Sequence, residues 1–201
     1  MKYKMITILT IVVMMLSACG SQETQVESDV ETQEEANDSS ESSAGTSIES
    51  TLTANLGVFS AFESIDLEGN VVNQDVLQEA ELTVLNLWGT FCGPCIAEMP
   101  DLGELSREYD STQVQIIGVV VDVYDDSGIA DALEIIETTE ASYLHLLPTE
   151  DLVNIYVGTV SAIPETLFLD SQGNILTSVV GSRDKESWKT LIDEVYNELV
   201  S

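Results

Sequence analysis

The sequence predicts an α/β domain over residues 52–201, with a central mixed sheet covered by helices on both faces. Residues 113–121 form a continuous, mostly β-branched run, which is typical of a parallel strand buried on both faces. Residues 82–88 form a second apolar run, which leads directly into a helical pattern of apolar residues over 94–109. A segment of this length can enclose a hydrophobic core as one domain.

The other elements follow from local signals along the chain. Gly69 and Asn70 supply a turn between the first two strands, because both residues tolerate positive φ. Residues 171–174 make a hairpin turn. The predicted order is strand 59–67, a strand from Val71, a helical turn 74–80, strand 82–88, helix 94–109, strand 113–121, helix 131–139, strand 143–147, helix 150–157, a strand opened by Pro164, strand 175–180 and a C-terminal helix.

The C-terminal helix has a start signal and an apolar face. Ser182 or Asp184 is expected to cap it. The apolar residues that share one face of this helix are Trp188, Leu191, Ile192, Val195 and Leu199.

Residues 1–18 are expected to be a secretory signal peptide. Lys2 and Lys4 precede an uncharged apolar run over 5–16, which is too short as a helix to cross a hydrocarbon core of about 30 Å. The run ends in Leu-Ser-Ala-Cys-Gly, which resembles a bacterial lipobox. The resemblance implies cleavage before Cys19 and lipid attachment to it; the alternative is a free cysteine behind an ordinary signal.

Residues 19–51 are expected to form a disordered tether. Nine acidic residues and no basic one occur among Ser, Thr and Gln, with no apolar period to bury. A partner-binding tail is the alternative. The whole chain carries a net charge of −30, which argues against binding nucleic acid or docking on an anionic membrane.

Two cysteines, Cys92 and Cys95, are separated by Gly93 and Pro94 at the junction of the 82–88 strand and the following helix. A helix N-terminus favours an anion, so a thiol there loses its proton more easily, and only the thiolate attacks a disulfide. Cys92, expected to be exposed, is therefore predicted to attack, and Cys95, one turn into the helix, to resolve the mixed disulfide.

Two other interpretations of this pair remain open. Half of a zinc site would need two further ligands, and the chain offers only Cys19 and His145. His145 is expected to be a packed or surface residue, so no metal and no cofactor are predicted. Alternatively, both cysteines are inert and buried.

The stretch Asn-Leu-Trp-Gly-Thr-Phe-Cys-Gly-Pro-Cys-Ile-Ala-Glu-Met-Pro over 86–100 resembles the active site of the TlpA/ResA-like branch of thioredoxin-fold proteins. The resemblance extends over about 56–200 and implies a thioredoxin-like fold, with an insertion between the central strand and the Pro164 strand. The buried aspartate of cytosolic thioredoxin is replaced by Asn86. The resemblance therefore points to Glu98 as the proton acceptor for Cys95; the alternative is an acid of the first helical turn, favoured by the helix dipole.

Pro164 opens an apolar strand, a position that suits a residue without an N–H. The resemblance implies a cis bond between Ile163 and Pro164 that faces the cysteine pair, with Ile163 offering backbone groups to an extended substrate; a plain strand-edge proline is the alternative. It also gives Trp88 a substrate-binding role. The Pro-Glu-Thr sequence is similar to that of reductases of cytochrome c maturation.

The expected function is that of a lipid-anchored, extracytoplasmic thiol-disulfide oxidoreductase that reduces disulfides in exported proteins, including apocytochrome c. A membrane electron donor of the CcdA/DsbD-like kind would re-reduce the Cys92–Cys95 pair. The alternatives are a disulfide-forming oxidase, a peroxiredoxin-like thiol peroxidase, and a binding module whose disulfide is only structural. The peroxidase pattern Pro-x-x-x-Thr-x-x-Cys is absent, because no proline occupies its place before Cys92.

Overall fold

The computed structural model describes residues 57–59 and 61–201, all within the compact unit Thr46–Ser201. The predicted signal peptide, Cys19 and the acidic tether lie outside the described residues. None of the helices in the described part combines the length and the apolar character needed to span a bilayer.

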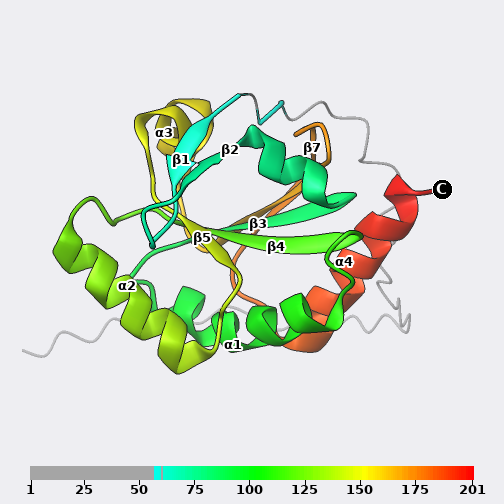
Figure 1. The fold of residues 1–201 in the computed structure, drawn as a ribbon. Helices are drawn as coiled ribbons and strands as arrows, with labels where there is room; N and C mark the ends of the chain where they lie inside the picture. The colour runs from blue at the N-terminus through cyan, green and yellow to red at the C-terminus, as the bar shows by residue number, and fades with distance from the viewer. Residues whose placement is uncertain (1–56, 60) are drawn as a thin grey trace, which may run out of the picture. The chain divides into compact units, whose positions relative to one another are not determined.

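A five-stranded mixed sheet forms the centre of the domain, as the sequence predicts (Figure 1). The strands lie in the order β5-β4-β3-β6-β7, with β3 and β4 parallel, β4 and β5 parallel, and β6 antiparallel to both β3 and β7. Their bounds are β3 Leu82–Trp88, β4 Val114–Val120, β5 Leu144–Leu146, β6 Glu165–Asp170 and β7 Ile175–Val180.

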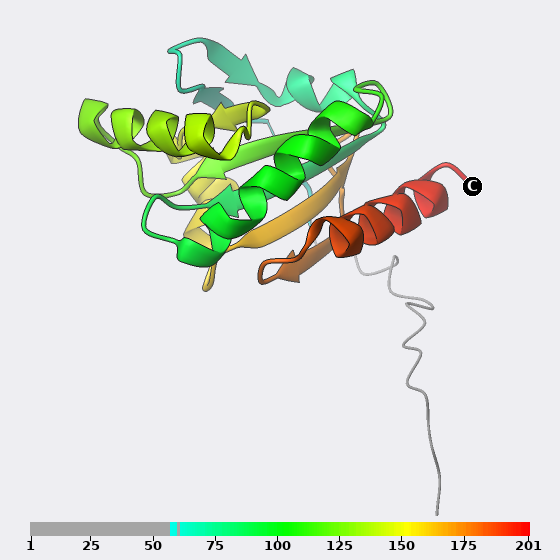
Figure 2. The same cartoon turned by 90° about the horizontal axis from the view of Figure 1, so that it is seen from below.

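Helices cover both faces of this sheet. Figures 1 and 2 show α1 and α4 on one face, with α2 beside α1, and the β1–β2 hairpin and α3 on the opposite face. The bounds are β1 Glu63–Ile65, β2 Val71–Asn73, the 3₁₀ helix η1 Gln74–Glu79, α1 Gly93–Glu108, α2 Asp126–Thr139, α3 Glu150–Ile155, the 3₁₀ helix η2 Val157–Thr159 and α4 Lys185–Leu199.

The side chains of β3 alternate between the two halves of the core. Leu85 and Leu87 pack with the hairpin side, whereas Leu82 and Val84 pack with α1 and α4. Trp88 continues the second set and packs against both cysteines. The strand is buried along its whole length, which explains its continuous apolar sequence.

Two predicted boundaries need correction. The 59–67 strand is interrupted: Val58 bridges Asn174 and the Phe59 N–H donates to Gly173, so only Glu63–Ile65 pairs with β2. Helix α2 begins at Asp126, five residues earlier than expected, because the Asp125 side chain accepts from the Gly128 N–H. The strand that Pro164 was expected to open begins directly after it, at Glu165, as predicted.

Other predictions are confirmed. Asp184 caps α4 by accepting from the Ser187 N–H. Gly69 takes a φ of 90° in the predicted turn. The insertion between β4 and β6 consists of α2, β5, α3 and η2.

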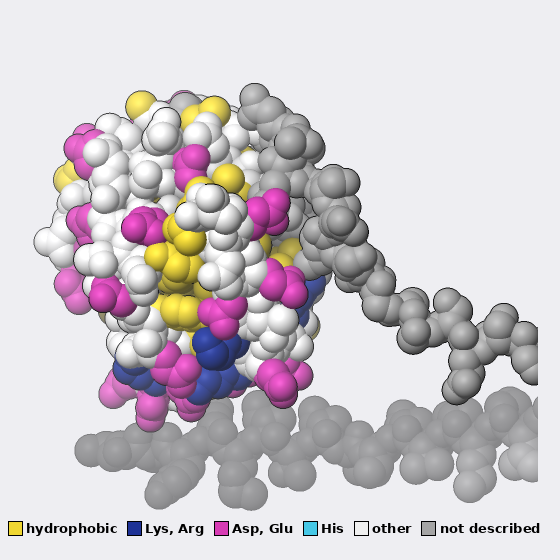
Figure 3. All heavy atoms as spheres, turned by 90° about the vertical axis from the view of Figure 1, so that its right-hand side faces the viewer, with side chains coloured by type: hydrophobic (Ala, Val, Ile, Leu, Met, Phe, Trp, Pro, Cys, Tyr) yellow, Lys and Arg dark blue, Asp and Glu magenta, His cyan; other side chains and the backbone are white. Residues whose placement is uncertain are grey.

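Acidic side chains are scattered over the face in Figure 3, and the few Lys and Arg side chains there lie mainly in its lower part. Lys185 is already paired with Glu104 and Glu108 at 2.6 Å each.

Candidate functional site

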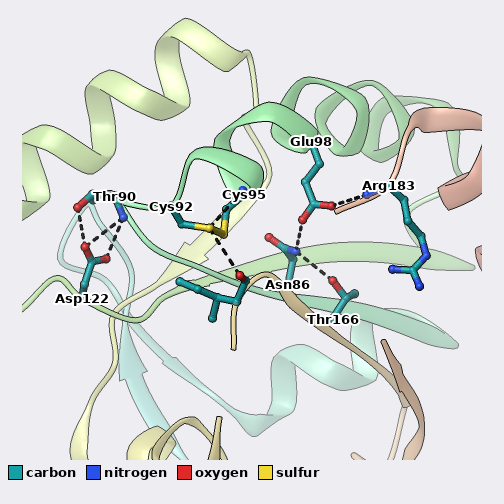
Figure 4. The surroundings of a disulfide bond; sticks show 9 residues. Asn86, Thr90, Cys92, Cys95, Glu98, Asp122, Thr166 and Arg183 are labelled. Carbon is teal, nitrogen blue, oxygen red and sulfur yellow. Dashed lines mark hydrogen bonds between the residues drawn. A yellow bond between two sulfur atoms is a disulfide. The ribbon is translucent and has the colours of Figure 1, made fainter. Parts of the chain in front are cut away.

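Cys92 and Cys95 form a disulfide at the N-terminus of α1, with an S–S length of 1.98 Å (Figure 4). Cys92 is the N-cap of the helix, and its sulfur accepts from the Cys95 backbone N–H at 3.2 Å. The predicted strand-to-helix junction is therefore confirmed. The first sulfur of the pair lies where the unpaired N–H groups of a helix converge.

The two sulfurs differ in burial less than expected. The prediction of an exposed Cys92 is wrong in the disulfide form, since the residue is 6% exposed and Cys95 is 0% exposed. The Cys92 sulfur contacts the Ile163 carbonyl oxygen at 3.8 Å. Phe91 is 75% exposed, so solvent lies immediately beside the pair.

Ile163 and Pro164 are joined by a cis peptide bond, as expected. Pro164 is buried directly before β6, and Ile163 is partly buried. The contact between the Ile163 carbonyl and the Cys92 sulfur places this pair against the disulfide. These observations favour a proline that faces the cysteine pair over a plain strand-edge proline.

Glu98 is buried on the inner side of α1, with 2% exposed. Its Oε1 accepts from Asn86 Nδ2, and its Oε2 accepts from the Arg183 backbone N–H and from Trp188 Nε1, each at 3.1 Å. Burial raises the pKa of this carboxyl, and the three donors and the Arg183 charge oppose the rise. Glu98 lies beyond the first turn of α1, so the interpretation as an acid of that turn is wrong.

Asn86 connects this carboxyl to the sheet. Its Nδ2 donates to Glu98 and also to Thr166 Oγ1 on β6, at 3.0 Å. Residue 86 pairs with Thr166 in the antiparallel register of β3 and β6, which fixes that second contact. The Asn86 oxygen has no partner.

Trp88 is fully buried, so the predicted contact between its side chain and a substrate is not available in this structure. Its Nε1 donates to His145 Nδ1 at 3.1 Å, and His145 Nε2 donates to the Ala141 carbonyl at 2.8 Å. The His145 ring stacks on Tyr143 with centroids 4.4 Å apart. His145 is buried, so of the two expected positions, packed or at the surface, the structure shows the packed one. This burial lowers the pKa of His145 to about 4.

Metal binding finds no support in residues 57–59 and 61–201. No group of three or more His, Cys, Asp or Glu side chains there is arranged to hold an ion.

Comparison with known proteins identifies the family. The sequence profile described as the AhpC/TSA family matches residues 58–178. The chain belongs to this family. The chain is 28% identical over 137 residues to thiol-disulfide oxidoreductase ResA of Bacillus cereus, covering 67% of this chain and 74% of that protein. It is 29% identical over 128 residues to thiol:disulfide interchange protein DsbE of Pseudomonas aeruginosa, covering 62% and 67%.

Solved structures agree on the fold of this AhpC/TSA-family domain. A thioredoxin-family thiol:disulfide interchange protein from Chlorobium tepidum gives a TM-score of 0.59 at 20% identity, covering 68% of this chain and 93% of that one. StoA from Bacillus subtilis gives 0.54 at 20% identity, covering 66% and 95%. The fold is thioredoxin-like, and the chain is a thiol-disulfide oxidoreductase of the ResA/DsbE type with a Cys92–Cys95 pair.

The family domain also contains a contact that sequence reasoning missed. Asp122 lies two residues after the end of β4 and accepts from the Thr90 hydroxyl at 2.6 Å and from the Thr90 N–H at 3.0 Å (Figure 4). It therefore ties the loop before Cys92 to the end of the neighbouring parallel strand. The sequence signal that could have indicated Asp122 is its position at the carboxyl end of a buried parallel strand, where functional sites form in such sheets.

An apolar groove of about 300 Å³ opens beside the disulfide. Phe91 and Tyr124 line one part of it, and Val157 and Ile163 another. None of the described residues that line it is charged. Ile163 belongs to the groove and also contacts the Cys92 sulfur, so the groove is continuous with the redox pair.

Proposed function

We propose that this chain is an extracytoplasmic, membrane-anchored reductase of disulfides in exported proteins. The observation that carries the proposal is the Cys92–Cys95 disulfide at the N-terminus of α1, in contact with Ile163 of the Ile163–Pro164 pair. This arrangement provides an attacking sulfur and a resolving sulfur one turn later. The Ile163 backbone lies beside them, where a substrate can bind. The relatives named thiol-disulfide oxidoreductase and thiol:disulfide interchange protein support the same reaction.

The reaction starts from the reduced pair. The Cys92 thiolate attacks one sulfur of the substrate disulfide, and the other substrate sulfur leaves as a thiolate that takes up a proton. Cys95 then passes its proton to an acceptor, the role that we assign to Glu98, and attacks the Cys92 sulfur, which releases the second substrate thiolate. Two electrons have passed to the substrate, and the enzyme is left with the disulfide seen here.

Re-reduction requires an electron donor. We assign this role to a membrane protein of the CcdA/DsbD-like kind, which would reduce the Cys92–Cys95 disulfide by the same exchange chemistry in reverse. The proposal assigns no cofactor, since thiol exchange alone carries both electrons.

Protein substrates fit the surface beside the pair. The Ile163 carbonyl lies against the Cys92 sulfur, where an extended substrate strand can pair with the backbone. The uncharged groove with Phe91 and Val157 offers a site for an apolar side chain next to the substrate cysteine. The Pro-Glu-Thr sequence at 164–166 supports apocytochrome c, with its pair of haem-attachment cysteines, as one such substrate.

Local chemistry favours the reducing direction. Gly-Pro is also the spacer of thioredoxin, whose potential is about −270 mV, against about −120 mV for the strong oxidant DsbA. Ile163 brings no hydroxyl to stabilise a Cys92 thiolate, and a less stable thiolate favours the disulfide. The buried Glu98 carboxyl disfavours a second negative charge nearby.

The N-terminal part of the chain would attach the domain to the membrane. Residues 1–18 would direct export, Cys19 would carry the lipid, and 19–51 would act as a tether of roughly 30 Å to the 52–201 domain. The Cys19→Ala variant should leave the membrane fraction while its purified form keeps the exchange rate of the wild type. A variant that stays with the membranes would refute the anchor.

The function itself is tested by trapping. A Cys95→Ala variant keeps the attacking sulfur and cannot resolve the mixed disulfide, so it should accumulate a covalent complex with its substrate through Cys92. The matched Cys92→Ala variant should accumulate none. Equal trapping by both variants, or by neither, would contradict a disulfide reductase.

Two assays address the alternative enzymes. Rapid consumption of hydroperoxide by the reduced protein would favour a thiol peroxidase, and net formation of disulfides in a reduced client would favour an oxidase.

A further inference from the structure

Asn86 is the polar residue in the row of β3 side chains that packs under α1. Leu82 and Val84 precede it in that row and pack with the α1 and α4 core, and Trp88 follows it and packs against both cysteines. Asn86 is fully buried at this place. A buried amide is expected to have all its polar atoms paired.

One atom of this amide lacks a partner. Asn86 Nδ2 uses both hydrogens, on Glu98 and Thr166, but Oδ1 accepts nothing. Over the described part of the chain, the Tyr143 hydroxyl is the other buried side-chain atom in this condition. A buried acceptor without a donor is costly, so it indicates a state of the protein in which a donor is present.

The disulfide lies on the side of the Asn86 oxygen (Figure 4). Cys95 and Glu98 are three residues apart on α1, and both are buried, so they point to the same inner side of the helix. In Figure 4 the Asn86 amide lies between the disulfide and Glu98, with its oxygen on the sulfur side and its nitrogen towards Glu98. A disulfide sulfur has no hydrogen to donate.

We propose that the Cys95 thiol of the reduced protein donates a hydrogen bond to Asn86 Oδ1. Reduction breaks the S–S bond, adds two electrons and two protons, and leaves one hydrogen on the Cys95 sulfur. An amide oxygen accepts this hydrogen bond without taking the proton, so it stabilises the neutral thiol.

The two thiols of the reduced pair would then differ in protonation. This inference rests on the proposed exchange reaction. The Cys92 sulfur faces the Cys95 N–H and the helix N-terminus, which favour a thiolate. Asn86 instead keeps Cys95 protonated until the mixed disulfide forms. The other titratable groups around Cys95 are Cys92 and Glu98 on α1, Tyr143 and His145 at β5, and Arg183 before α4.

The S–H stretching band of Cys95 tests the proposal directly. In the purified full chain, Cys92→Ser leaves Cys95 as the thiol of the pair, and subtracting the spectrum of a Cys92→Ser/Cys95→Ser variant removes every other band. A hydrogen-bonded thiol absorbs at lower frequency than a free one. Asn86→Val should move the band to higher frequency, whereas Asn86→Asp should keep it low.

These two variants are matched. Both lose the Nδ2 donor to Glu98 and Thr166, and only Asn86→Asp retains an oxygen that can accept from Cys95. Thr166→Val and Tyr143→Phe should leave the band in place. A band that does not move in Asn86→Val, or one that moves in Tyr143→Phe instead, would overturn the proposal.

Wild-type protein gives a second measurement that needs no variant. The side-chain carbonyl carbon of Asn86 should change its NMR shift on reduction with dithiothreitol, while that of the distant Asn174 should not. An unchanged Asn86 resonance would also overturn the proposal.

The redox equilibrium separates this inference from the proposed function. Asn86→Val should shift the equilibrium with dithiothreitol towards the disulfide by about fivefold, or roughly 20 mV. The two Nδ2 bonds are lost in both redox forms, whereas the bond from Cys95 is lost in the reduced form alone. A wild-type pair that dithiothreitol cannot reduce would refute the proposed function. The S–H band of the Cys92→Ser variant would still decide the role of Asn86.

Discussion

The indole Nε1 of Trp88 donates a hydrogen bond to Nδ1 of His145, 3.1 Å away, across the parallel strands β3, β4 and β5. Because His145 Nε2 bonds to the Ala141 carbonyl, the imidazole carries its hydrogen on Nε2 and accepts at Nδ1. Only the neutral ring can do both. The ring that packs against the disulfide is therefore held by a histidine that must remain uncharged.

Acid should weaken the fold through His145. Its pKa is lowered to about 4 by burial, so between about pH 6.5 and 4 the unfolded chain binds a proton that the folded chain does not. The free energy of unfolding should fall by about 3 kcal/mol over this range because of this group. Denaturant unfolding at several pH values measures it.

His145→Gln is the matched control for this effect. The glutamine keeps polar atoms but does not titrate, so its stability should depend less steeply on pH by the same amount. Glu98, whose raised pKa acts in the opposite direction, is present in both proteins and cancels. Parallel stability curves for the two proteins would contradict a buried neutral histidine.

Gly118 on β4 makes room for this histidine. A Cβ at residue 118 would collide with His145 Nδ1 and would lie 3.1 Å from Trp88 Nε1. Gly118→Ala should therefore destabilise the domain by about 2 kcal/mol and alter the fluorescence of Trp88. Gly93→Ala, where an added Cβ meets nothing within 4 Å, should do neither.

The elements that the sequence predicts best are those with continuous local patterns. The runs that became β3 and β4 are buried on both faces, so their residues record that burial directly. The prediction of a strand over 59–67 was wrong because residues 58 and 59 bond to the β6–β7 hairpin, more than 100 residues away. The early start of α2 depends on one cap, and its first turn contains no apolar repeat.

The candidate site was predictable only in part, because several of its contacts join residues that are far apart in the sequence. Cys92, Cys95, Ile163 and Pro164 occur in short motifs, and the structure brings them together. The partners of Glu98 come from β3, from α4 and from the loop before it, which no spacing in the sequence reveals. The burial of Trp88 depends on an equally distant histidine.

Alkylation should distinguish the two thiols of the reduced protein. Cys92 should react with iodoacetamide well below pH 8.5, because the helix N-terminus and the Cys95 N–H favour its thiolate, and the fully buried Cys95 should react much more slowly. Mass spectrometry of peptides from a pH series gives both rates. Faster alkylation of Cys95 would reverse the attacking and resolving roles.

Ile163→Thr should make the protein more oxidising. The Ile163 backbone contacts the Cys92 sulfur, so a hydroxyl on this residue can donate to the thiolate and stabilise the reduced form. The potential should rise by roughly 30 mV, a tenfold change in the equilibrium constant. Ile163→Val, which adds no donor, is the control and should leave the potential nearly unchanged.

The reduction potential of the Cys92–Cys95 pair is the most direct test of the proposed reductase. Equilibration with dithiothreitol or glutathione buffers, followed by Trp88 fluorescence, measures it. We expect a value below about −220 mV, on the thioredoxin side of the known range. A value near −120 mV would instead identify a disulfide-forming oxidase and contradict the proposed direction of the reaction.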